Sequence, residues 1–213
     1  MGLLYCLARH GETADNAARV FQGQGGRGLN RLGQAQASRL AERLRRAPPD
    51  AIFASDLERA AETARYVSEA CGVPVELDPD LREVDVGAWT GKGYDAISKL
   101  YPEEWTAWEA GLDVRRGGGE TYAELAERVG RALDRIASRY GDGSRVLVVS
   151  HGGAIKSWIA ELLGVAPGGL RVLAGVANAA LTVVERDARG RHRLHSWNDA
   201  AHLEGLVVDE HSD

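Results

Sequence analysis

Two histidines in this sequence each follow a short apolar run and precede a glycine. His10 comes after residues 3–8 and directly follows Arg9, and His151 comes after residues 145–149. A histidine beside an arginine can present a ring nitrogen to an anion, and a neighbouring glycine lets the backbone approach closely. A single loop histidine is more often structural, so this interpretation depends on which other residues accompany the two rings.

Two further charged residues strengthen the pattern. Arg59 falls in the first turn of an expected helix just after the apolar run at residues 51–54, and Glu83 lies in a polar loop. Taken alone, Arg59 would be a solvated helix charge and Glu83 a surface carboxylate. Together with His10 and His151 they fit one anion-binding catalytic site better than four unrelated roles.

The apolar runs and helical repeats predict the elements that would bring these residues together. Strands are expected over residues 3–8, 51–54, 73–77, 145–149, 180–185 and 192–197. Helices are expected over residues 30–46, 55–70, 121–140 and 154–163, the second and third opened by capping boxes at Ser55 and Thr121.

This alternation predicts an α/β fold: a three-layer sandwich with a mostly parallel central sheet and helices on both faces. In such sheets ligands bind beyond the carboxyl ends of the strands. Arg9 with His10, the segment 55–59 and His151 all fall at such ends.

The bulk composition bounds the function class. The chain has 213 residues, a length that suits one domain over 1–213, and a formal net charge of −5. A mildly acidic chain has no electrostatic footprint for nucleic acid or for an anionic membrane. Two cysteines without metal-ligand spacing, and no targeting segment, favour a reduced, cytoplasmic protein. Residues 91–119 interrupt the alternation and are expected to form a helical lid insertion.

Four motifs resemble those of the histidine phosphatase family (phosphoglycerate mutase-like), in the expected order and over nearly the whole chain. They read LARHGET at 7–13, SDLERA at 55–60, LRE with GAWTG at 81–91, and SHGG at 150–153. The ending of the chain is similar to that of the bacterial phosphatase branch. The resemblance implies a metal-independent phosphoric monoester hydrolase of the histidine acid phosphatase type.

The resemblance also implies a role for each matching residue. His10 would be transiently phosphorylated, Arg9, Arg59 and His151 would bind the phosphoryl group, and Glu83 would be the general acid and base. The expected substrate contacts are Asn16, Gln22, Gly23 and Gly152. Asp85 is close enough to Glu83 in sequence to be a rival acid.

Each implied role has a physical reason. A neutral imidazole is a competent nucleophile, and like-charge repulsion from Arg9 and Arg59 should disfavour protonation of His10. Phosphoryl transfer needs mainly positioning and charge stabilisation, which fixed guanidinium groups can supply. We therefore expect no metal and no cofactor.

Three alternatives stay open at this point. A cofactor-dependent phosphoglycerate mutase shares the site, although mutase relatives generally carry longer insertions than this compact chain. A non-catalytic phosphate-binding regulatory module is disfavoured by the intact motifs. A metal hydrolase could use His10, His151 and Glu83 as ligands, but the two arginines would repel a cation.

The substrate is expected to be a small phosphorylated metabolite, such as a sugar phosphate or a phosphoglycerate derivative. Tyr94, Tyr101, Trp105 and Trp108 either stack on its body or simply pack the insertion. Arg115 and Arg116 either reach a second anionic group or are solvated. Whether the chain forms a homodimer is left open.

Overall fold

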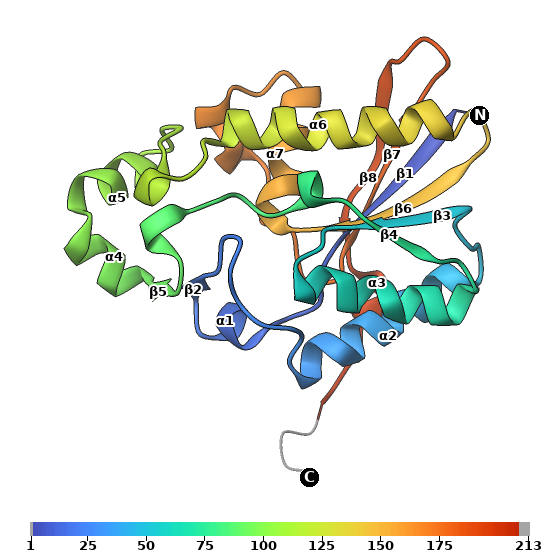
Figure 1. Cartoon of the computed structure of the whole chain (residues 1–213), viewed down its shortest axis with the longest axis horizontal. Helices are drawn as coiled ribbons and strands as arrows, with labels where there is room; N and C mark the ends of the chain where they lie inside the picture. Colours follow the sequence, from blue (N-terminus) through green and yellow to red (C-terminus); the bar gives the residue numbers. More distant parts are fainter. Residues whose placement is uncertain (1, 209–213) are drawn as a thin grey trace.

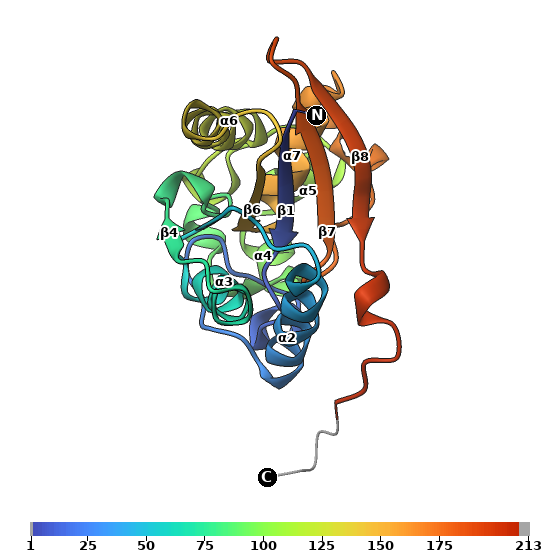
Figure 2. The same cartoon turned by 90° about the vertical axis from the view of Figure 1, so that its right-hand side faces the viewer.

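A central six-stranded sheet organises the computed structural model, which describes residues 2–208 (Figure 1). The strand order is β4-β3-β6-β1-β7-β8, and Figure 2 shows β4 and β8 toward opposite edges. The bounds are β1 Leu3–Arg9, β3 Ala51–Ala54, β4 Val75–Leu77, β6 Arg145–Ser150, β7 Leu181–Arg186 and β8 His192–Asp199. The first four strands are parallel, whereas β7 runs antiparallel to both β1 and β8. The mostly parallel α/β sheet expected from the sequence is therefore confirmed.

Helices cover both faces of this sheet. Alternate residues of β1 belong to two separate cores, with Tyr5 in one and Cys6 in the other. The first core is closed by α6 (Tyr122–Arg139) and α7 (Gly152–Leu162), and the second by α2 (Arg31–Arg45) and α3 (Glu58–Cys71). Figure 1 shows these two pairs on opposite sides of the sheet. This arrangement confirms the three-layer sandwich.

Helix starts were predicted well where one local signal decides them. The capping box at Thr121 is present, because its side chain accepts from the N–H of Glu124 while the Glu124 carboxylate accepts from the Thr121 N–H. Helix α7 begins two residues earlier than expected, which places His151 at the N-cap and Gly152 in the first turn.

The capping box predicted at Ser55 is wrong. Helix α3 has Leu57 at its N-cap and no side-chain cap. The Ser55 hydroxyl instead accepts from the N–H of Leu57 at 3.2 Å and contacts Nε2 of His151 at 2.8 Å. The hydroxyl therefore joins the segment before α3 to the distant His151, and does not cap the helix.

The segment 91–119 forms α4 (Tyr94–Leu100), α5 (Pro102–Glu109) and the short 3-10 helix η3 (Arg116–Gly118). Helices α4 and α5 lie beyond the sheet, at the left of Figure 1. The start of the segment, β5 (Lys92–Gly93), pairs with β2 (Val20–Phe21), which follows the short helix α1 (Ala14–Ala17). This pairing ties the insertion to the loop after β1. Within residues 2–208, no helix has the length and apolar character that crossing a membrane would need.

Candidate active site

The carboxyl ends of β1, β3 and β6 meet at one edge of the sheet, where Arg9 pairs with Ser150 and Ala54 with Val149. A pocket of about 370 Å³ opens at this edge. Eight of the nine predicted site residues line it: Arg9, His10, Asn16, Gln22, Gly23, Arg59, Glu83 and Gly152. The ninth, His151, is fully buried next to His10, with ring centroids 5.1 Å apart. The parallel sheet thus brings four distant segments together.

His10 is held in one tautomer. Its Nδ1 lies 2.7 Å from the carbonyl oxygen of Gly11, so Nδ1 carries the proton and donates it. Its Nε2 is then an acceptor, and it receives the N–H of Arg59 Nε at 3.3 Å. Burial, followed by repulsion from Arg9 and Arg59, holds the pKa of His10 well below its usual range. The site therefore presents an unprotonated ring nitrogen to the two guanidinium groups.

His151 is neutral for the same reasons. Burial, then the positive charge of Arg59, holds its pKa well below the ordinary value. When Ser55 donates its hydroxyl proton to Nε2, Nδ1 of His151 bears the ring proton and can serve as a donor.

The two arginines are anchored by backbone carbonyl groups. Arg9 Nη1 donates to the oxygen of Val176 at 2.6 Å, and Arg59 donates from Nη1 and Nη2 to the oxygens of Gly25 and Gly23. Burial lowers the pKa of both guanidinium groups, yet arginine stays charged in proteins. Arg59 therefore fixes the loop after β2 while it faces His10.

Two buried donors in this cluster lack an acceptor among residues 2–208. Nε of Arg9 and Nδ1 of His151 are buried without a hydrogen-bond partner in the described part of the chain. Leaving buried polar groups unpaired is costly, so such groups call for an explanation. Oxygens of a bound anion, such as a phosphoryl group, would satisfy both.

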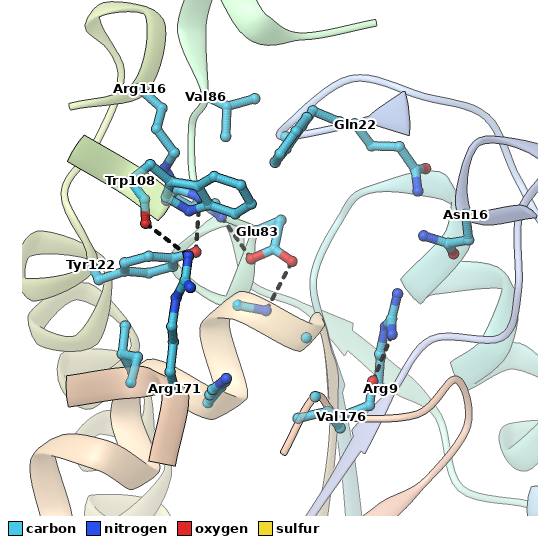
Figure 3. Close-up of a pocket in the computed structure, with 18 of the residues that line it drawn as sticks. Arg9, Asn16, Gln22, Glu83, Val86, Trp108, Arg116, Tyr122, Arg171 and Val176 are labelled. Carbon is cyan, nitrogen blue, oxygen red and sulfur yellow. Dashed lines mark hydrogen bonds between the residues drawn. The ribbon is translucent and has the colours of Figure 1, made fainter. Parts of the chain in front are cut away.

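Glu83 is held at the start of α7 by three backbone N–H groups. Its Oε1 accepts from Val84 at 2.9 Å and from Ala154 at 3.1 Å, and its Oε2 accepts from Gly153 at 3.0 Å. A Cβ at Gly153 would overlap Oε1 of Glu83, so a larger residue there would have to displace the carboxylate. Nη2 of Arg128 donates to the Glu83 carbonyl oxygen at 3.3 Å and stabilises the loop that carries Glu83. Figure 3 shows the carboxylate in the middle of the pocket.

Asp85, the other carboxylate considered as the acid, stabilises the backbone of its own loop. Its Oδ1 accepts from the N–H of Gly87 at 2.8 Å, and Asp85 does not line the pocket. Of the two carboxylates, only Glu83 is placed to meet a ligand bound beside His10.

Helix α1, which carries Asn16, and the loop after β2, which carries Gln22 and Gly23, form the opposite wall. Nδ2 of Asn178 donates to Oδ1 of Asn16 at 3.2 Å and to the carbonyl oxygen of His10 at 3.1 Å. Gly23 has φ +52°, and a Cβ there would lie 2.7 Å from Val86 Cγ2. Gln22 is buried, and its Oε1 has no partner within residues 2–208. The Gln22 side-chain oxygen is therefore available to a ligand.

The aromatic side chains divide between the two uses considered from the sequence. Tyr94 and Trp108 line the pocket, whereas Tyr101 and Trp105 do not, and pack on Trp89 at ring distances of 6.4 and 6.1 Å. The adjacent residues Arg115 and Arg116 also differ in their surroundings. Arg115 is exposed and paired with Glu124, while Arg116 is buried and lines the pocket.

Sequence reasoning missed four contributors to this site. Ser55 was predicted to cap a helix and not to contact His151, and Asn178 was not predicted to contact His10. Lys156 and Arg171 also line the pocket, and neither lies in a motif. No local signal marked them, because only the packing of α7 against η4 (Pro167–Val172) brings them to the pocket.

The alternative of a metal site gains no support from the side-chain arrangement. Within the described residues, no group of three or more His, Cys, Asp or Glu side chains is arranged to hold a metal ion. The residues facing His10 are instead the guanidinium groups of Arg9 and Arg59.

Comparisons with known proteins agree with this geometry. Residues 5–200 match the model of the histidine phosphatase superfamily (branch 1). A metal-independent phosphoserine phosphatase from Arabidopsis thaliana is 36% identical over 206 residues, covering 94% of this chain and 83% of the relative. A probable phosphoglycerate mutase from Yersinia enterocolitica is 37% identical over 213 residues, covering 96% of each chain. The solved structure of a mycobacterial glucosyl-3-phosphoglycerate phosphatase with VO3 superposes with a TM-score of 0.85 at 31% identity, covering 92% of this chain and 99% of that one. The chain therefore belongs to branch 1 of the histidine phosphatase superfamily.

Proposed function

We propose that this chain hydrolyses the phosphomonoester of a small phosphorylated metabolite through a phosphohistidine on Nε2 of His10. One observation carries the proposal: a buried, neutral imidazole whose unprotonated nitrogen faces Arg59, with Arg9 beside it. The unpaired donors of Arg9 and His151 supply the contacts that a phosphoryl group needs.

The first step transfers the phosphoryl group to the enzyme. Nε2 of His10 attacks phosphorus as the bond from phosphorus to the leaving oxygen breaks. Arg9, Arg59 and His151 stabilise the charge on the equatorial oxygens. A protonated Glu83 gives its proton to the leaving alkoxide, which departs as an alcohol.

The second step releases the phosphate. The ionised Glu83 takes a proton from a water molecule, whose oxygen attacks phosphorus while the bond to Nε2 breaks. Inorganic phosphate leaves, and both His10 and Glu83 return to their starting states. These two reaction steps require no metal, so we expect full activity in the presence of a chelator.

We favour hydrolysis over the mutase reaction. A metal-independent phosphoserine phosphatase and a mycobacterial glucosyl-3-phosphoglycerate phosphatase among the relatives support hydrolysis, whereas the probable mutase from Yersinia enterocolitica is of similar length and does not separate the two reactions. The lid expected over residues 91–119 is part of this proposal, and its Trp108, Leu112 and Arg116 line the pocket. A coupled assay on phosphoglycerate, with and without the bisphosphorylated primer, tests the choice, because primer-dependent isomerisation would contradict it.

The intermediate itself is tested by rapid quench after mixing with a ³²P-labelled phosphomonoester. We expect a protein-bound label that is labile in acid and stable in alkali. His10→Ala should abolish the label and lower turnover by on the order of 10⁴-fold. His195→Ala is the matched control, since His195 is exposed on β8 and contacts Glu185 outside the pocket. Turnover without a labelled histidine, or a label retained in His10→Ala, would refute the proposal.

A further inference from the structure

The pocket holds more positive charge than the proposed chemistry uses. Five cationic side chains line it, and Glu83 is the single acidic one: Arg9, Arg59, Arg116, Lys156 and Arg171. The whole chain carries a net charge of −5, so this excess is local. Arg9 and Arg59 bind the phosphoryl group in the proposed reaction, which gives no role to Arg116, Lys156 and Arg171.

Within residues 2–208, Arg116, Lys156 and Arg171 form no ion pair with a carboxylate, whereas Arg115 next in sequence pairs with Glu124. Burial and the positive charge of Arg171 lower the pKa of Lys156. Like charges gathered in a partly enclosed space repel one another, and a bound anion would relieve this repulsion.

Arg116 gives the clearest indication of an anion-binding site. Its side chain is 2% exposed, it stacks on the ring of Tyr122 at 4.1 Å, and its Nη1 donates to the Tyr122 hydroxyl at 2.9 Å. Its Nε and Nη2 are buried without an acceptor among the described residues. A buried guanidinium with two unused donors is suited to a planar, two-oxygen anionic group.

Arg116 and Arg171 lie apart from the phosphoryl site, and Lys156 is close enough to Arg171 to interact with its charge. Figure 3 shows Arg116, Tyr122, Trp108 and Arg171 on one side of Glu83, and Arg9, Asn16 and Gln22 on the other. Arg171 donates to the carbonyl oxygen of Trp108 at 3.2 Å, which links it to the aromatic wall. A ligand that reached both sides would pass Glu83 and contact the Trp108 ring.

We propose that Arg116, Lys156 and Arg171 form a subsite for a second anionic group of the substrate. The substrate class is then a phosphomonoester that carries a carboxylate or a second phosphate at its other end. This inference rests on the proposed phosphatase function, and it adds the residues that select among phosphomonoesters.

The test compares substrates that differ only in the second anion. One pair is 3-phosphoglycerate and glycerol 3-phosphate, and the other is fructose 1,6-bisphosphate and fructose 6-phosphate. We expect the wild-type kcat/KM to favour the doubly anionic member of at least one pair by about tenfold or more. In the double variant Lys156→Gln/Arg171→Gln, and separately in Arg116→Gln, this ratio should collapse toward one.

The ratio is measured within each variant, so a loss of folded protein does not move it. Arg115→Gln is the matched control, because Arg115 is exposed and should leave the ratio at the wild-type value. Collapse in the first pair alone assigns a carboxylate, in the second alone a phosphate, and in both a general anion subsite. A wild-type ratio near one in both pairs, or a ratio unaffected by the variants, overturns the inference. Failure of the phosphatase proposal is recognised separately, since wild-type protein would then not release phosphate even from p-nitrophenyl phosphate.

Discussion

The two sides of the pocket are built in different ways. On the phosphoryl side, side chains project from strand ends or helix starts and are fixed by backbone groups: His10 by Gly11, Arg59 by Gly23 and Gly25. On the other side, Arg116 comes from the insertion, and Lys156 and Arg171 come from α7 and η4. Those three cations lack counterions in the described residues.

This difference separates chemistry from selection. A reaction that needs a nucleophile within a fraction of an ångström of its target requires rigid supports, and sheet edges provide them. The residues that contact the rest of the substrate can lie on an insertion, where a substitution does not disturb the strands of the sheet. We therefore expect changes on the phosphoryl side to alter rate, and changes on the other side to alter preference.

After the loss of the nucleophile in His10→Ala, the largest effect should come from Glu83→Gln. The amide keeps the shape but cannot transfer a proton, so kcat for an alkyl phosphate should fall by roughly 10²–10⁴-fold. For p-nitrophenyl phosphate the loss of the first step should be smaller, because the nitrophenolate leaves without a proton. A burst of nitrophenolate followed by slow turnover would show this.

The matched control for that experiment is Asp85→Asn. Asp85 caps the Gly87 N–H away from the pocket, and asparagine keeps an oxygen for that contact. Turnover should stay near the wild-type value. If the Asp85 variant lost the activity and Glu83→Gln kept it, the assignment of the proton donor would be wrong.

A smaller loss is expected for Gly153→Ala. The added methyl group would overlap Oε1 of Glu83 and displace the carboxylate, for which we expect a loss of roughly 10²-fold in kcat. Gly141→Ala is the comparison, because a Cβ there meets nothing within 4 Å. Steady-state kinetics of the two variants would check the argument. Equal activity would mean that the position of Glu83 is not critical.

Most of the fold and the phosphoryl side were predictable from sequence because their signals are local. Apolar runs locate the strands, and parallel pairing alone then brings His10, Arg59 and His151 to one edge. The interpretation of Ser55 as a helix cap was wrong, because its hydroxyl is shared with His151, 96 residues away. No pattern within a single segment contains such a contact.

The other side of the pocket was not predictable for a related reason. Arg115 and Arg116 are adjacent, and a glycine-rich stretch has no periodicity that tells which of them turns inward. The outcome depends on Gly117, whose φ of +57° and close packing against Val86 and Ala88 orient η3. Lys156 lines the pocket where α7 packs against η4, and no pattern within the helix marks that contact.

Stability offers a further contrast between the two sides. Arg59→Met should lower the free energy of unfolding by about 1–3 kcal/mol, since it leaves the carbonyl groups of Gly23 and Gly25 without donors. Arg116→Met should stay at or above the wild-type value, because it removes a buried charge that has unused donors. Urea unfolding in phosphate-free buffer would measure both. An equal loss in the two variants would remove the distinction between an anchored and an unpaired arginine.

The smallest effect concerns pH. The folded-state pKa values of His10 and His151 lie well below the unfolded value of about 6.5, so below that pH the unfolded chain binds more protons. The free energy of unfolding should therefore fall as pH drops from 6.5 toward 5.5, by at most about 1.4 kcal/mol per pH unit for each histidine. His192 and His202 also have lowered pKa values and add to the slope with the same sign.

Two double variants test this pH dependence. His10→Asn/His151→Asn should reduce the slope of the unfolding free energy against pH relative to wild type. His192→Asn/His202→Asn should reduce it less, because burial and two arginines lower the pKa values of His10 and His151 more strongly. Unfolding measured by urea at several pH values would separate the three proteins. Identical slopes in wild type and the His10/His151 variant would mean that these imidazoles are not held neutral, which would remove the physical basis for a ready nucleophile on the phosphoryl side.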